Sequence, residues 1–156
     1  MILRSGPWDG RKHDTALAHL NTPGRKIIII EDPVEYNLPV LQQIQVQDEI
    51  GLSFARVLRG VLRHDPNVIM VGEIRNPETA EMAIRAAQVG RLVLSTLHTN
   101  GAGAAVSRLV DLGVPRFLID DVLHGVLGQE LRHVACEGCG GTGVARRELR
   151  VERWTP

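Results

Sequence analysis

Three short apolar runs, each stopped by polar residues, dominate the hydrophobic pattern of the chain. They span residues 27–30, 68–71 and 92–94 and consist mainly of Ile, Val and Leu. Uninterrupted runs of this length and composition are typical of strands that are buried on both faces in a parallel sheet. We therefore predict three strands of one parallel sheet.

The segments between these strands have apolar residues at helical spacing. Ser53 is placed as the N-cap of one amphipathic helix, and Asn76 as the N-cap of a second helix that closes at Gly90. The pattern predicts two more helices, over 104–112 and 117–127. Alternation of strand and helix is typical of an α/β fold with right-handed crossovers.

Composition narrows the class of protein further. The chain has 156 residues, of which 44% are hydrophobic, and its 18 basic and 18 acidic residues cancel. Such a chain can bury one core, and its neutral charge disfavours indiscriminate binding to nucleic acid or anionic membranes. The sequence has neither a long apolar stretch at its start nor a run of roughly 20 apolar residues, so we expect a cytosolic protein.

Polar residues follow all three predicted strands. Glu31 and Asp32 follow the first, with Glu35 close behind, Glu73 follows the second and His98 the third. Because ligands bind beyond the carboxyl ends of parallel strands, we expect these groups to converge on one edge. They suit a magnesium-bound phosphate and an activated water. The alternative is that polar residues merely mark the ends of strands.

A segment before the first predicted strand partly matches a phosphate-binding loop. Gly6 and Lys12 have the separation of the first Gly and the Lys of that motif. The motif also requires Gly directly before the Lys, so that backbone amides approach the phosphates, and Ser or Thr directly after it to hold magnesium. Arg11 and His13 occupy those two positions, so this segment alone fails the motif.

Three segments resemble the boxes of one family. Residues 30–36 (IEDPVEY), 62–75 (LRHDPNVIMVGEIR) and 94–100 (LSTLHTN) closely resemble the Asp box, Walker B box and His box of the bacterial type II secretion and type IV pilus assembly ATPases. The resemblance extends from about residue 2 to residue 149 and matches only the C-terminal half of a family member. It implies a RecA-like P-loop NTPase core with a mainly parallel sheet flanked by helices.

The resemblance also implies a division of the chain and roles for its residues. Residues 1–128 would form a RecA-like ATPase core, incomplete at its N-terminus, and residues 129–156 a C-terminal remnant. In the family, the Walker B glutamate orients the attacking water, the Asp box surrounds magnesium and that water, and the His box contacts the γ-phosphate. Carried onto this sequence, the catalytic residues are Glu73, Glu31 and His98, and the residues that bind ATP and Mg²⁺ are Gly6, Lys12, Asp32 and Glu35.

The family also implies partners and a location. Its members are hexameric motors that couple ATP hydrolysis to fibre assembly or protein export, on inner-membrane platform proteins that they contact through domains missing here. We therefore expect subunits of the same family as partners, no nucleic acid, and a cytoplasmic protein that is peripheral at the inner membrane. Arg56, Arg59 and Arg63 form a stripe that suits either solvent or a neighbouring subunit. The imperfect phosphate loop favours the alternative of a catalytically inactive fragment that acts as a subunit-interaction module.

The chain has two cysteines, Cys136 and Cys139, spaced as CxxC. Two cysteines are too few for a disulfide framework, and the spacing suits metal or redox chemistry. The pair resembles the second half of a four-cysteine zinc element found in secretion-type family members, but the first pair is absent. Recruiting His133 would still leave one tetrahedral position open, so we expect a reduced pair and no zinc site.

Overall fold

The structure is a computed structural model that describes residues 1–5, 11–140 and 143–155. Within these ranges the strands are β1 (Ile2–Ser5), β2 (Ile27–Glu31), β3 (Gln42–Gln45), β4 (Val68–Val71), β5 (Leu92–Thr96), β6 (Gly125–Ala135) and β7 (Val144–Trp154). The α-helices are α1 (Arg11–Leu20), α2 (Phe54–Val61), α3 (Pro77–Gln88), α4 (Ala104–Asp111) and α5 (Arg116–Val122). Short 3₁₀ turns are η1 (Asp48–Ile50), η2 (Leu62–His64) and η3 (Glu137–Cys139).

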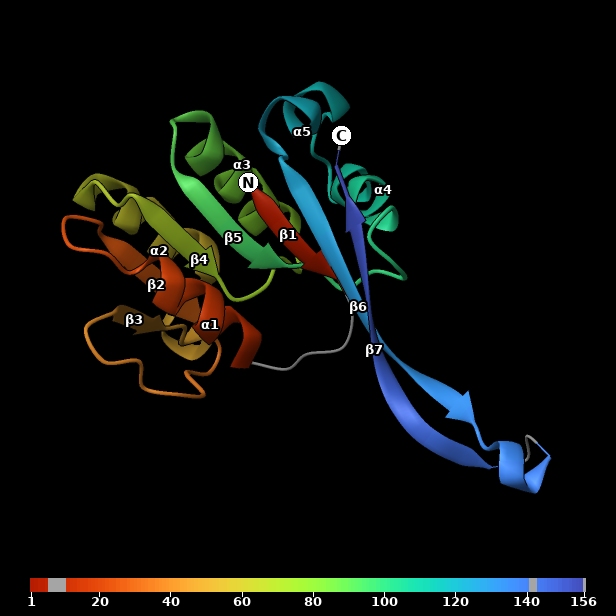
Figure 1. Cartoon of the computed structure of the whole chain (residues 1–156). Helices are drawn as coiled ribbons and strands as arrows, with labels where there is room; N and C mark the ends of the chain where they lie inside the picture. Colours follow the sequence, from red (N-terminus) through yellow and green to blue (C-terminus); the bar gives the residue numbers. More distant parts are fainter. Residues whose placement is uncertain (6–10, 141–142, 156) are drawn as a thin grey trace.

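All the strands belong to one sheet, in the order β3-β2-β4-β5-β1-β6-β7 (Figure 1). Neighbouring strands are parallel throughout, except that β7 runs antiparallel to β6. The expected fold class, an α/β fold with a mainly parallel sheet flanked by helices, is confirmed. The three predicted strands are also confirmed, as β2, β4 and β5.

Helices cover the two faces of the sheet unequally. On one face, Leu17 of α1 packs with Ile27 and Ile29 of β2 and with Val68 and Met70 of β4. On the other face, buried residues of α2, α3, α4 and α5 form the larger core with the opposite sides of the same strands. Both apolar sides of these central strands are therefore buried, which explains their uninterrupted hydrophobic runs.

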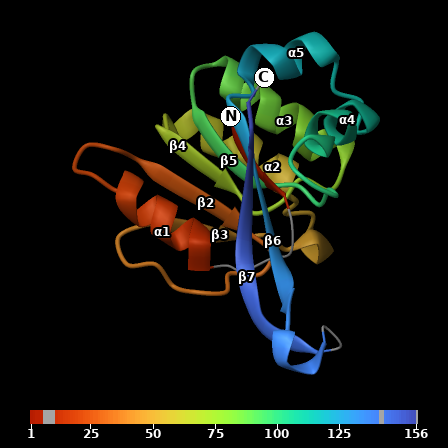
Figure 2. The same cartoon turned by 45° about the vertical axis from the view of Figure 1, so that its right-hand side comes forward.

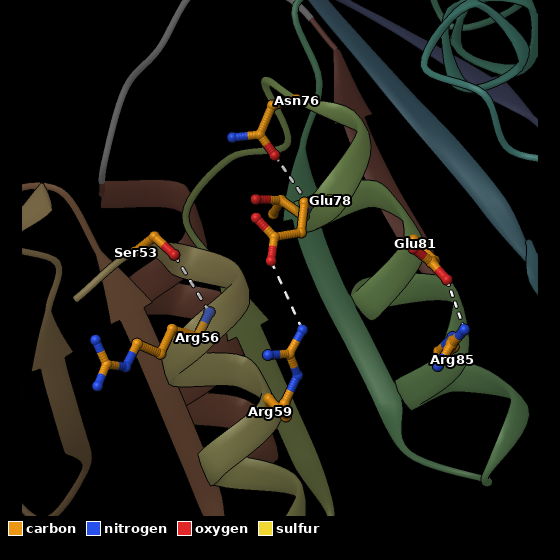
Figure 3. Close-up of polar contacts among 8 residues, drawn as sticks. Ser53, Arg56, Arg59, Asn76, Glu78, Glu81 and Arg85 are labelled. Carbon is orange, nitrogen blue, oxygen red and sulfur yellow. Dashed lines mark hydrogen bonds and ion pairs between the residues drawn. The ribbon is translucent and has the colours of Figure 1, made fainter. Parts of the chain in front are cut away.

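The predicted helix starts at α2 and α3 are confirmed by their caps (Figure 3). Ser53 Oγ accepts a hydrogen bond from the backbone N–H of Arg56 at 3.4 Å, and Asn76 Oδ1 accepts one from Thr79 at 2.8 Å. Pro77 occupies the first position of α3, where its missing N–H costs nothing. These caps fix where the chain turns back from the edge of the sheet.

The helix predicted over 117–127 is wrong in its second half. The helix α5 ends at Val122, and residues 125–127 belong to β6. The backbone N–H of His124 donates to Met1 O at 2.8 Å, so the chain enters the sheet beside β1. Pairing with a buried strand has overridden the local helical spacing.

Strands β6 and β7 form a long antiparallel ribbon that projects from the sheet (Figures 1 and 2). Pairing between β1 and β6 stops at Ser5 and Gly128, whereas β7 pairs with β6 as far as Ala135. The division expected between residues 128 and 129 falls within β6 and stays a prediction. At the base of the ribbon, Glu152 accepts a hydrogen bond from the backbone N–H of Ala102 at 3.0 Å, which ties β7 to the start of α4.

Candidate functional site

A cavity of about 290 Å³ lies at the carboxyl ends of β2, β4 and β5. Its lining includes five residues that the sequence placed on one edge of the sheet, and their convergence is confirmed. The residues around it are Glu31, Asp32, Pro33, Glu35, Phe54, Gly72, Glu73, Arg75, Thr96 and His98.

Glu73 lies close to two other polar side chains that line this cavity. It follows β4, and its side chain is only 12% exposed. Its Oε2 atom lies 2.5 Å from Nε of Arg75 and 3.6 Å from Nε2 of His98. Glu73 is therefore a nearly buried carboxylate between a permanent cation and an imidazole. Arg75 stands two positions beyond Glu73, but residue spacing alone gave no sign of this contact.

Hydrogen bonds between β4 and β5 hold the backbone at the point where Glu73 leaves the sheet. The hydroxyl of Thr96 donates to Gly72 O at 2.5 Å, and the backbone N–H of Ile74 donates to Thr96 O at 3.0 Å. The hydroxyl of Ser95 donates to Val71 O at 2.7 Å. Because each of these partners is buried, the position of Glu73 is set by the sheet rather than by a free loop.

Glu31 ends β2 and is held by the edge strand β3. Nε2 of Gln43 donates to Oε2 of Glu31 at 3.0 Å and to the backbone oxygen of Tyr36 at 2.8 Å. Asp32 and Glu35 are exposed at the mouth of the cavity. Sequence reasoning missed Gln43, because β3 has the sequence QQIQ and shows no apolar pattern.

The phosphate-loop residues fall largely outside the described part of the chain. Gly6 lies outside the described residues. Lys12 belongs to α1, which follows β1 in the chain, but its side chain is likewise outside what the structure describes. Their roles in binding phosphate stay predictions.

The donor set of the cavity suits a hard cation. Within residues 1–5, 11–140 and 143–155, no three His, Cys, Asp or Glu side chains are grouped so that they alone would hold a metal ion. Mg²⁺ keeps several waters and takes one or two carboxylates together with substrate phosphates, so the carboxylates of Glu31, Asp32, Glu35 and Glu73 fit it.

Cys136 and Cys139 belong to the connection between β6 and β7, which forms the tip of the ribbon and lies far from the sheet edge that holds this cavity (Figure 1). The turn η3 brings them together, and Cys139 Sγ accepts a hydrogen bond from the backbone N–H of Gly143 at 3.1 Å. The expected absence of a zinc site stays a prediction. Among the helices that the structure describes, none is both long and apolar enough to span a membrane.

This fold, with acidic residues and an imidazole at the carboxyl edge of a parallel sheet, defines an α/β protein with a site suited to phosphate chemistry. Residues 11–156 match the family described as "Type II/IV secretion system protein", and the chain belongs to this family. The recognition made from the three boxes is therefore confirmed.

Three curated relatives are similar over most of this chain. It is 51% identical over 142 residues to the putative type II secretion system protein E of Escherichia coli and 48% identical over 142 residues to the type II secretion system protein E of Pseudomonas aeruginosa. It is 45% identical over 153 residues to the type II secretion system ATPase E of Vibrio cholerae. These matches cover 89%, 89% and 96% of this chain but 29%, 28% and 30% of the relatives. The chain thus spans less than a third of their length.

Solved structures support the fold. The pilus retraction motor PilT with bound ADP matches with a TM-score of 0.76 at 37% identity, over 99% of this chain and 47% of that one. The ATPase DotB of Legionella pneumophila matches with a TM-score of 0.73 at 28% identity, over 99% and 44%. The VirB11 ATPase of Brucella suis, at 22% identity and a TM-score of 0.72 over 99% and 47%, supports the fold alone.

Proposed function

We propose that the cavity between β2, β4 and β5 is the ATP-hydrolysing site of a secretion or pilus-assembly ATPase. The observation that carries this proposal is the position of Glu73, a nearly buried carboxylate 3.6 Å from His98 at the carboxyl edge of the sheet. The family of the chain and the ADP bound to the similar PilT support nucleotide use.

In this proposal each acidic residue has a separate task. Glu73 orients the attacking water and accepts its proton, a task that requires a positioned carboxylate of low exposure. Oxygens of Glu31, Asp32 and Glu35 would hold Mg²⁺ and its waters, and the charge of the ion would offset that of the phosphates. His98 contacts the γ-phosphate, and Lys12 with the backbone at Gly6 contacts the β- and γ-phosphates.

Arg75 competes with a water for the carboxylate of Glu73. Its Nε atom occupies one oxygen of Glu73 at 2.5 Å, the same oxygen that lies nearest His98. A water held by Glu73 must therefore use the other oxygen, or Arg75 must move away. Arg75 is 66% exposed, so it is free to turn toward a phosphate when one arrives.

At the scale of the whole machine, we propose a cytoplasmic hexamer at the inner membrane that couples ATP hydrolysis to fibre assembly or protein export. The named relatives are type II secretion proteins and a pilus retraction motor. The chain spans less than a third of the type II secretion relatives, so contacts with a membrane platform would involve regions of the relatives outside the part that this chain matches.

A second candidate is a catalytically inactive subunit-interaction module. The observation in its favour is Arg11 and His13 at the two positions of the phosphate loop where bare backbone and a hydroxyl are needed. A chain of this kind would keep the fold and the surfaces for other subunits without turnover.

Glu73→Gln tests the first candidate against the second. We expect the unchanged chain to bind Mg²⁺-ATP and hydrolyse it slowly, and Glu73→Gln to bind but lose about 100-fold or more in turnover. Glu78→Gln, an exposed carboxylate on α3, is the matched control and leaves turnover unchanged. Calorimetry and phosphate release provide the two measurements. An unchanged chain without ATP binding would favour the inactive module.

A further inference from the structure

The β6–β7 ribbon has two chemically unlike faces. Residues directly opposite each other in an antiparallel pair share a face, and Leu131 lies opposite Leu149 while Gln129 lies opposite Val151. Leu131 is 60% exposed, and Leu149 and Val151 are each 51% exposed. This face of the ribbon therefore presents apolar side chains to solvent in its middle, and the pair of His133 and Arg147 follows them toward the tip.

The opposite face is charged and paired. Glu130 lies opposite Arg150, and Arg132 lies opposite Glu148. Glu130 Oε1 is 2.6 Å from Arg132 Nε and 3.6 Å from Arg150 Nη1. Acidic and basic side chains thus alternate both along and across the ribbon.

The strand β7 ends the sheet and has an open outer edge. Within the described residues it pairs only with β6. Its 11 residues contain neither Pro nor Gly, and the one register irregularity of the ribbon lies near the tip, between Val134 and Ala135. Natural edge strands are usually short or interrupted, because unpaired N–H and C=O groups are a template for another strand.

We propose that β7 pairs with β7 of a second copy of this chain, antiparallel and centred on Leu149. The sequence Arg146-Arg147-Glu148-Leu149-Arg150-Val151-Glu152 is self-complementary about this centre. Glu148 then lies opposite Arg150 of the second copy, and Arg146 lies opposite Glu152. The two-fold axis repeats each pair, which gives four cross-strand pairs of opposite charge.

The pairing extends the existing pattern over four strands. On the charged face, one row of side chains crosses all four strands. It contains Glu130 and Arg150 of one copy, followed by Glu148 and Arg132 of the second copy. Acidic and basic residues therefore alternate along the whole row. On the apolar face, Leu131 and Leu149 of both copies form one row of four leucines. The opposite-charge pairs select the register, and the leucines and the new backbone hydrogen bonds supply the attraction.

Registers centred one residue to either side lose this complementarity. Centring on Glu148 sets that residue against itself and sets Arg146 against Arg150. Centring on Arg150 sets Arg150 against itself and Glu148 against Glu152. Because like charges directly opposite each other are unfavourable, the Leu149 register is preferred over both.

Charge reversal tests the pairing by sedimentation velocity over a concentration series. We expect the unchanged chain to dimerise, and Glu148→Arg or Arg150→Glu each to weaken dimerisation about tenfold or more, since each sets like charges opposite one another at two places. Mixing these two variants restores association, because Arg then faces Glu at all four positions. Arg116→Glu, which reverses an exposed ion-paired residue on α5, is the control and leaves dimerisation unchanged.

A cross-link tests the register in the same protein. In a Cys136→Ser, Cys139→Ser background, Leu149→Cys is expected to form an intermolecular disulfide, because opposite Cα atoms in an antiparallel pair lie about 4.5–5.5 Å apart. Val151→Cys faces Arg147 and is expected to stay reduced. The proposal is overturned if the unchanged chain is monomeric at every concentration. It is also overturned if the mixture of the two charge variants fails to associate, or if both cysteine positions cross-link equally.

Discussion

Gly72 shows how one residue without a side chain shapes the candidate site. It stands between β4 and Glu73, and its N–H donates to Ile30 O at 2.8 Å. A Cβ atom at this position would lie 3.1 Å from the same backbone oxygen and 3.8 Å from the ring of Phe54. Glycine therefore lets β2 and β4 approach closely where Glu31 and Glu73 leave the sheet.

Gly72→Ala is expected to destabilise the chain by about 1–3 kcal/mol, because backbone atoms of the neighbouring strand must move. Gly60→Ala is the matched control, since nothing lies within 4 Å of a Cβ atom there and the position is inside α2. We expect it to stabilise the chain by up to ~1 kcal/mol. Urea unfolding measures both. Equal effects of the two substitutions would contradict the steric argument.

The sequence predicted the acidic residues and the imidazole of the site but not the groups that hold them. Glu31, Glu73 and His98 could be placed because each follows a buried strand, and the ends of parallel strands lie on one edge. Gln43 could not be placed, because it reaches Glu31 from a strand with no apolar pattern. The contact between Arg75 and Glu73 depends on side-chain conformation, which residue spacing does not specify.

At the scale of elements, burial decided which segments could be predicted. The central strands β2, β4 and β5 are covered on both faces, so their sequences are continuous apolar runs. Helices α2 and α3 carry their own N-cap signals at Ser53 and Asn76. By contrast, β3 and β7 are edge strands without buried residues, and β1 is short and contains polar residues. Neither periodicity nor composition therefore separates these strands from loops.

The tip of the ribbon leads to a prediction about zinc. Two thiolates from Cys136 and Cys139 supply half of a tetrahedral set, so we expect purified chain to retain well under one zinc ion per chain. Atomic emission on dialysed protein measures this, with Cys136→Ser, Cys139→Ser as the blank. Near-stoichiometric zinc in monomeric protein would contradict the expectation. The proposed pairing of β7 sends the two tips in opposite directions, so that dimer would not create a shared zinc site.

At the scale of the whole molecule, folding of the sheet and binding of the phosphates depend on different parts of the sequence. The acidic cavity is lined by residues between Glu31 and His98, and the sheet behind it includes β1, which lies between β5 and β6. Binding ATP additionally requires a shaped phosphate loop that leads into α1, and the sequence departs from the motif at Arg11 and His13, in the first turn of that helix. A correctly folded cavity is thus compatible with weak nucleotide binding.

The last prediction is that repairing the loop increases ATP binding and turnover. The motif requires Gly at the position of Arg11, so that backbone amides can approach the β-phosphate, and a hydroxyl at the position of His13, because Mg²⁺ prefers oxygen ligands. Loose binding misaligns the γ-phosphate, and a misplacement of about 1 Å costs ~100-fold in rate. We therefore expect Arg11→Gly with His13→Thr to bind Mg²⁺-ATP at least ~10-fold more tightly.

The comparison uses calorimetry on both chains, followed by phosphate release from each chain fused behind the upstream region of the Pseudomonas aeruginosa relative. Lys12→Ala in the repaired chain is the control, and it is expected to remove the gain because the ammonium group neutralises the β- and γ-phosphates. If the unmodified chain binds ATP as tightly as the repaired one, Arg11 and His13 do not impair the loop. The phosphate loop would then give no reason to expect slow turnover, and an active motor would be the better interpretation.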